Sequence, residues 1–184
     1  MSRPDLGPAA DALSELVAGV SDDQLELSTP CQATSLGALL DHVDGLALAF
    51  TCAARKEPLP PGVDPTPRAD AASLLPGWRS RIPTRLAELV EAWRDPAAWE
   101  GMATVGGVDL PAAACRATGL DELVVHAWDI ARSHRTRPAL VLIRRPVTNA
   151  GRKAPERSGM RSGEPPSGHE CGAVSRRAGP KRLR

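Results

Sequence analysis

The chain has 184 residues, with 23 basic and 22 acidic side chains and a formal net charge of +1. Apolar residues make up 42% of it, which is enough for one globular core at this length. The sequence contains no apolar run of the roughly 20 residues that span a bilayer, and its start lacks a charged-then-apolar secretory pattern. We therefore expect a cytoplasmic protein that is neither secreted nor embedded in a membrane.

Charge divides the chain into two unlike segments. Residues 1–140 hold 12 basic and 19 acidic side chains, a net charge of −7, whereas residues 141–184 hold 11 and 3, a net charge of +8. The basic segment has 11 Gly and Pro among its 44 residues and no hydrophobic periodicity. Such a composition cannot bury enough apolar surface to offset the loss of chain entropy. We predict a folded domain over residues 1–138 and a disordered basic tail over residues 139–184.

The acidic segment is predicted to fold as helices. Apolar residues recur every three or four positions in three stretches, residues 6–20, 36–50 and 78–93. Thr34 or Ser35 can cap the second of these helices. A loop with five prolines follows over residues 57–67, and Pro83 is expected either to start or to kink the third helix.

A small hairpin and a fourth helix complete the predicted domain. Two short β-prone runs flank a Gly-Gly pair over residues 103–109, which indicates a tight turn between two strands. Asp109 can cap a helix that accepts Pro111 in its first turn and continues to about Ser133. No nucleotide-binding or familiar hydrolase motif occurs in the chain. The predicted fold class is all-α.

The fourth predicted helix carries a carboxylate and an imidazole four residues apart, Glu122 and His126. Side chains with this spacing lie beside one another on one helix face. His42, on the apolar stripe of the second predicted helix, is the only other histidine inside the predicted helices. Two histidines and one carboxylate form a three-ligand metal site with open positions, as in catalytic centres. Asp129 could orient an imidazole as an outer acceptor.

The positions of His42, Glu122 and His126 are also compatible with an interpretation in which no metal is bound. A Glu–His pair at this spacing is more often a helix-stabilising contact, and a histidine on an apolar stripe is more often a hydrogen-bonded core residue. Cys31 and Cys115 could lie near a metal, although inert buried thiols are commoner. Polar groups that point into a helical core nonetheless need partners, which favours a shared site.

Four segments share the spacing of a known family: Thr29–Cys31, Leu36–Gly45, Gly107–Pro111 and Leu120–Ala131. They resemble the actinobacterial branch of the DinB/YfiT-like superfamily, which includes the metal-binding N-terminal domain of mycothiol-dependent maleylpyruvate isomerase. The resemblance implies an up-and-down four-helix bundle that holds a divalent metal, zinc, through a histidine of the second helix and a later Glu-x-x-x-His pair. Those positions match His42, Glu122 and His126.

The resemblance also implies a thiol-dependent transferase or isomerase, in which the metal activates a small-molecule thiol such as mycothiol toward an unknown electrophile. The sequence identifies no catalytic base. Two other classes stay open: a non-catalytic metal-binding or stress-response bundle, and a nucleic-acid-associated protein that uses the basic tail. The tail lacks aromatic residues for base stacking, which disfavours nucleic acid as a partner. The oligomeric state is open, with a homodimer as one option.

The resemblance ends near Leu140. Relatives continue there with another amphipathic helix, whereas this chain continues with the basic tail, so the bundle is expected to lack its last helix. A tail rich in Arg, Pro and Gly is what a displaced reading frame in GC-rich coding DNA yields. We hypothesise that the tail is a frameshift product, and resequencing of the locus tests this idea. A downstream frame without an amphipathic helix would exclude it.

Overall fold

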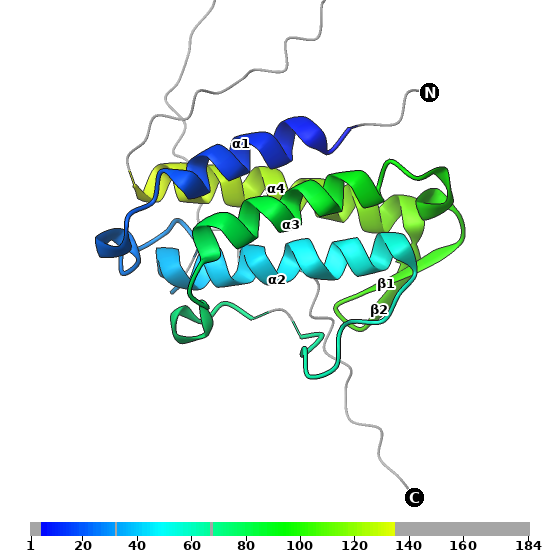
Figure 1. The fold of residues 1–184 in the computed structure, drawn as a ribbon, viewed down its shortest axis with the longest axis horizontal. Coiled ribbons are helices and arrows are strands. Elements are labelled where there is room, and N and C mark those ends of the chain that lie inside the picture. The colour runs from blue at the N-terminus through cyan, green and yellow to red at the C-terminus, as the bar shows by residue number, and fades with distance from the viewer. Residues whose placement is uncertain (1–4, 32, 67, 135–184) are drawn as a thin grey trace, which may run out of the picture.

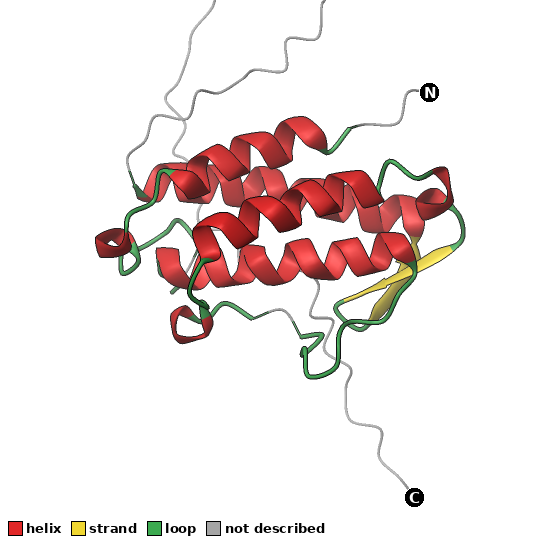
Figure 2. Ribbon diagram, in the orientation of Figure 1, coloured by secondary structure: helices red, strands yellow, loops and turns green. Residues whose placement is uncertain are grey.

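Four helices and a two-stranded sheet make up the part of the chain that the structure describes (Figures 1 and 2). The structure is a computed structural model in which residues 5–31, 33–66 and 68–134 are described. The helices are α1 (Gly7–Ala18), α2 (Leu36–Arg55), α3 (Trp78–Ala92) and α4 (Ala112–Ser133). The strands are β1 (Met102–Val105) and β2 (Val108–Pro111), and short 3-10 turns are η1 (Asp22–Gln24), η2 (Ala71–Ser73) and η3 (Pro96–Trp99). The expected basic tail lies outside the described residues.

The predicted helices and hairpin are all present, and their ends have local physical causes. Ser35 caps α2, because its side-chain oxygen accepts a hydrogen bond from the backbone N–H of Ala38 at 3.3 Å. Pro83 lies inside α3, which begins at Trp78, so the proline does not start this helix. The hairpin is antiparallel and pairs Val105 with Val108 across the Gly-Gly turn.

The predicted cap of α4 is wrong. Asp109 lies within β2, opposite Thr104, and its carboxylate accepts a hydrogen bond from the Thr104 hydroxyl. The strand continues to Pro111, which takes the N-cap position of α4 without a side-chain hydrogen bond. Asp109 cannot cap the helix because the hairpin already uses its side chain.

The order of the helices differs from the expected up-and-down arrangement. In that arrangement each helix runs antiparallel to the next and packs against it. Here α1 and α2 each pack against both α3 and α4, and α2 and α3 run in the same direction (Figure 1). The long connection over residues 56–77 allows this, because it carries the chain back along the helices before α3 begins.

The four helices share one apolar core. Each contributes fully buried aliphatic side chains, such as Leu13 from α1, Leu39 from α2, Leu86 from α3 and Ile130 from α4. Burial of side chains of this size is the main stabilising contribution to such a core. α2 is long and apolar enough to cross a membrane, yet most of it is buried among the other helices, as in the core helix of a folded domain. Its packing against α4 brings the candidate site residues together.

Candidate metal centre

His42 enters the site from α2 and is 5% exposed. Its Nδ1 atom lies 2.9 Å from the backbone carbonyl oxygen of Arg68, in the loop between α2 and α3. A carbonyl can only accept, so Nδ1 carries the hydrogen and donates it, which leaves the lone pair on Nε2. The loop therefore selects the imidazole tautomer that offers Nε2 as a ligand atom.

Glu122 and His126 enter from α4, one helical turn apart. Nε2 of His126 lies 2.9 Å from a carboxylate oxygen of Glu122, and its Nδ1 lies 3.3 Å from a carboxylate oxygen of Asp129. Asp129 is completely buried and His126 is 3% exposed. The expectation that Asp129 lies next to an imidazole of the site therefore agrees with the structure. Both ring nitrogens of His126 face carboxylates on its own helix.

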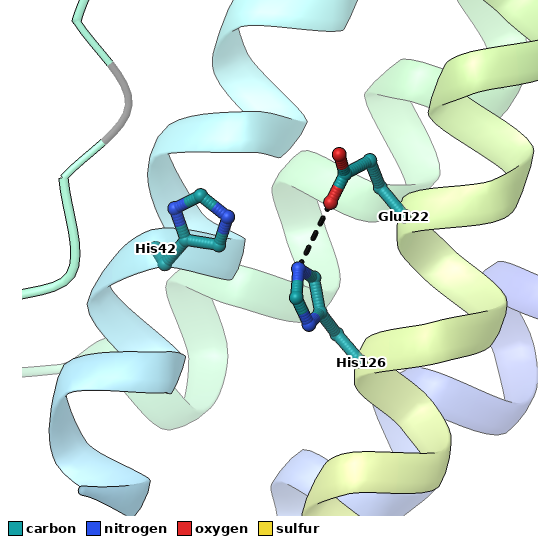
Figure 3. Close-up of side chains that lie close together, drawn as sticks. All are labelled: His42, Glu122 and His126. Carbon is teal, nitrogen blue, oxygen red and sulfur yellow. Dashed lines mark ion pairs between the residues drawn. The ribbon is translucent and has the colours of Figure 1, made fainter. Parts of the chain in front are cut away.

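The three predicted ligands meet between α2 and α4 (Figure 3). One ligand atom from each of His42, Glu122 and His126 lies within 4.8 Å of the other two. The two imidazole rings are 5.1 Å apart between centroids and are nearly perpendicular, at 85°. Two imidazole nitrogens and one carboxylate oxygen are donors that zinc and other first-row divalent ions accept. The residues present therefore fit such an ion.

The electrostatics of the cluster favour a positive charge on the His126 ring. Burial alone would lower the pKa of His126, but hydrogen bonds with Asp129 and Glu122, together with their negative charges, outweigh it and raise the pKa to about 9. Burial and the neighbouring charge of His126 lower the pKa of His42. Without a metal, the proton on His126 thus supplies the positive charge that faces the two carboxylates.

A model of the family described as mycothiol maleylpyruvate isomerase N-terminal domain matches residues 6–131. The chain belongs to this family. Comparison with curated proteins and with solved structures finds no match. The family resemblance expected from the sequence is therefore confirmed, and all three candidate ligands lie within the matched range.

In this member of the family, a cavity of about 320 Å³ lies beside the cluster, with His42 in its wall. α2, the loop between α2 and α3, and the hairpin turn near Gly106 enclose it. Asp44 also lines the cavity, and its carboxylate forms ion pairs of 2.8 Å with both Arg81 and Arg85 of α3. The cavity is thus large enough for part of a small molecule and adjoins one candidate ligand.

The contact between His42 and the backbone carbonyl of Arg68 was not predictable from the sequence. Backbone groups carry no sequence signal, and the proline-rich loop has no periodicity from which its path could be predicted. Neither Cys31 nor Cys115 belongs to the ligand cluster. Cys115 is completely buried, and burial raises the pKa of its thiol to about 11, so it is an inert core residue.

Proposed function

We propose that the domain binds one divalent metal ion, zinc, through His42, Glu122 and His126, and that this centre serves a thiol-dependent transferase or isomerase reaction. The observation that carries the proposal is the convergence of three ligand atoms from two helices within 4.8 Å of one another in the core. The family match supports the use of a thiol co-substrate, because the family's description names mycothiol. Mycothiol is therefore the thiol that we propose as co-substrate.

The residues around the cluster would each have a defined task. Bound there, a divalent ion supplies Lewis acidity, which lowers the pKa of a coordinated thiol or water. The carbonyl of Arg68 fixes the His42 ring, and Asp129 holds the His126 ring from its far side. Three protein ligands leave at least one position for a small molecule. We place the remainder of that molecule in the cavity that His42 lines.

The metal content of the purified full chain tests the first half of the proposal. We expect about one metal ion per chain after reconstitution with zinc and removal of free metal, and a large loss of bound zinc in His126→Ala and His42→Ala. His134→Ala is the matched control, because it removes a histidine from the end of the same helix outside the cluster. Equal metal content in His126→Ala and the control would overturn the assignment.

Binding of the thiol tests the second half. We expect the cobalt-substituted protein to show a new sulfur-to-cobalt charge-transfer band when mycothiol is added, and no such band with the oxygen analogue of the thiol. A metal-loaded protein without this band, and without activity toward any thiol and electrophile, would be a non-catalytic metal-binding bundle. That outcome would contradict the enzymatic proposal and leave the metal proposal standing.

We further propose that the four helices form a DinB/YfiT-like bundle over residues 1–138. The match over residues 6–131 and the shared core of the four helices support this boundary. Expression of residues 1–138 tests it. A cooperative thermal transition equal to that of the full chain is expected, and loss of that transition would show that the unit extends beyond residue 138.

A further inference from the structure

A second cavity, of about 260 Å³, lies among the start of α1, the end of α3, η3 and the first turns of α4. Its lining includes Trp93 and Trp99 and three charged side chains, Asp5, Arg94 and Arg116. None of these residues belongs to the ligand cluster or lines the cavity beside His42. We call it the Arg116 cavity.

Arg116 is buried in the wall of this cavity and forms no ion pair with a carboxylate of the described residues. The residue is 3% exposed, and its guanidinium carbon lies 4.5 Å from the centre of the Trp99 ring. Within residues 5–31, 33–66 and 68–134, its Nε has no hydrogen-bond partner, and no carboxylate lies within the 4.0 Å of an ion pair. A buried cation without an ion-pair partner destabilises a fold, so the contact with Trp99 alone does not explain why the protein keeps Arg116 at this position.

The other polar groups of the Arg116 cavity form no ion pair with Arg116. Asp5 adds a negative charge that favours the charged form of Arg116, and one of its carboxylate oxygens accepts a hydrogen bond from the N–H of Gly7 at 3.0 Å. Arg94 adds a second positive charge and pairs at 3.0 Å with Glu91 in a largely exposed contact. The buried indole N–H of Trp93 has no acceptor in the part of the chain that the structure describes. The lining of the Arg116 cavity thus offers more hydrogen-bond donors than acceptors.

We propose that the Arg116 cavity binds a small organic carboxylate, whose acid group pairs with Arg116 and whose apolar body lies against Trp93 and Trp99. A guanidinium presents parallel N–H groups that match the two oxygens of a carboxylate. Indole rings supply flat apolar walls for the remainder of the ligand, and small-molecule sites commonly combine such walls with one charged anchor. The cavity volume limits the ligand to a small acid.

Benzoate is a suitable probe, because it joins one carboxylate to one flat apolar ring. Two of the chain's four tryptophans line the Arg116 cavity, so titration of the full chain is followed by tryptophan fluorescence. We expect saturable binding with a Kd on the order of 1 mM, and at least about tenfold weaker binding of the uncharged analogue benzamide. The protein is first treated with a chelator, so that the probe cannot bind at a metal.

Arg116→Met removes the charge and keeps most of the side-chain volume. We expect benzoate binding to weaken by at least about tenfold, while the midpoint of thermal unfolding stays level or rises because a buried unpaired charge is lost. Arg132→Met is the matched control, since Arg132 lies over another tryptophan, Trp128, on an exposed face and should bind benzoate as the unmodified chain does. Arg116→Lys keeps the charge and should retain part of the affinity.

Three results would overturn the proposal. They are equal benzoate affinity in Arg116→Met and the unmodified chain, equal affinity for benzamide and benzoate, and binding that disappears when metal is removed. If Arg116→Met does not fold, the comparison of benzoate with benzamide on the unmodified chain still decides the question. Benzoate binding is measured on metal-free protein, so its outcome does not depend on whether the protein binds a metal. Failure of this proposal can therefore be distinguished from failure of the proposed function.

Discussion

A carboxylate oxygen of Asp129 lies 3.3 Å from Nδ1 of His126, in a position where the aspartate is completely buried. The contact holds the imidazole from the side opposite Glu122, whose carboxylate is 2.9 Å from Nε2. A buried aspartate that faces a candidate metal ligand both fixes the ring and strengthens it as a ligand. Asp129 is therefore a positioning residue for the proposed centre.

Asp129→Asn should weaken zinc binding about 10- to 100-fold, the usual effect of removing a partner that orients a metal ligand. The amide keeps the size of the side chain but loses the negative charge, so the fold should be retained. Competition with a chromophoric chelator measures the Kd for zinc. Asp121→Asn, on the exposed side of α4, is the control and should bind as the unmodified chain does. An unchanged Kd in Asp129→Asn would show that the contact has no role in metal binding.

Zinc binding should release a proton and should weaken in acid. In the metal-free protein the pKa of His126 is about 9, so at pH 7 the ring must lose a proton before Nε2 can bind a metal. The apparent affinity should therefore fall by about tenfold for each pH unit below 9. His42 should add no proton at pH 7, because its pKa is lowered. Calorimetry in buffers of different ionisation enthalpy counts the protons, and a count of zero would contradict the charge assigned to His126.

The raised pKa of His126 should also make the stability of the metal-free protein depend on pH. A histidine whose folded pKa is raised stabilises the fold fully below its ordinary value of 6.5, and this contribution is lost as the pH rises through about 9. Urea unfolding of chelator-treated protein should therefore show a falling free energy of unfolding between pH 6.5 and 9. His126→Gln is the control and should lose this part of the pH dependence. An equal pH dependence in both proteins would assign the effect to another group.

The clustering of His42, Glu122 and His126 was predictable from the sequence, and so was an acceptor at Asp129, whereas the contact that holds His42 was not. Glu122 and His126 follow from helical spacing, and His42 follows from its place on an apolar stripe, because one period describes both helices. The carbonyl of Arg68 depends on the path of a proline-rich loop, which no period describes. The cap assigned to Asp109 failed because a cross-strand partner, Thr104, competes for its side chain. Helix order also escaped prediction, since it depends on where long connections cross the molecule.

Asp44 links α2 to α3 and should be important for stability. Its side chain is 9% exposed and pairs at 2.8 Å with both Arg81 and Arg85, which are themselves about a quarter exposed. Asp44→Asn should lower the free energy of unfolding by about 1–3 kcal/mol, because charge-assisted hydrogen bonds in a buried place are lost. Urea denaturation measures this change. Asp22→Asn breaks the exposed ion pair with Arg79 and should change the free energy of unfolding little. Equal losses of stability in Asp44→Asn and Asp22→Asn would show that burial does not strengthen the Asp44 ion pairs.

Gly119 permits the close approach of α4 to α2 and should not tolerate a side chain. A Cβ atom at this position would lie 3.1 Å from Cδ1 of Phe50, which is 3% exposed and cannot move without disturbing the core. An alanine normally stabilises a helix relative to glycine by about 1 kcal/mol, but overpacking of a filled core costs about 1–3 kcal/mol. Gly119→Ala should therefore be destabilising on balance, as measured by urea denaturation.

Gly45→Ala is the matched control for Gly119→Ala, because Gly45 lies in α2 with no atom within 4 Å of the added Cβ. At Gly45 the substitution should change only the helix propensity. The free energy of unfolding of Gly45→Ala should therefore rise by about 0.5–1 kcal/mol. Opposite signs for the two variants would show that contact with Phe50, and not the backbone, selects glycine at position 119. Because Gly119 lies one turn before Glu122, its alanine variant should also displace α4 at the proposed centre and weaken zinc binding, whereas Gly45→Ala should leave the zinc Kd nearer that of the unmodified chain.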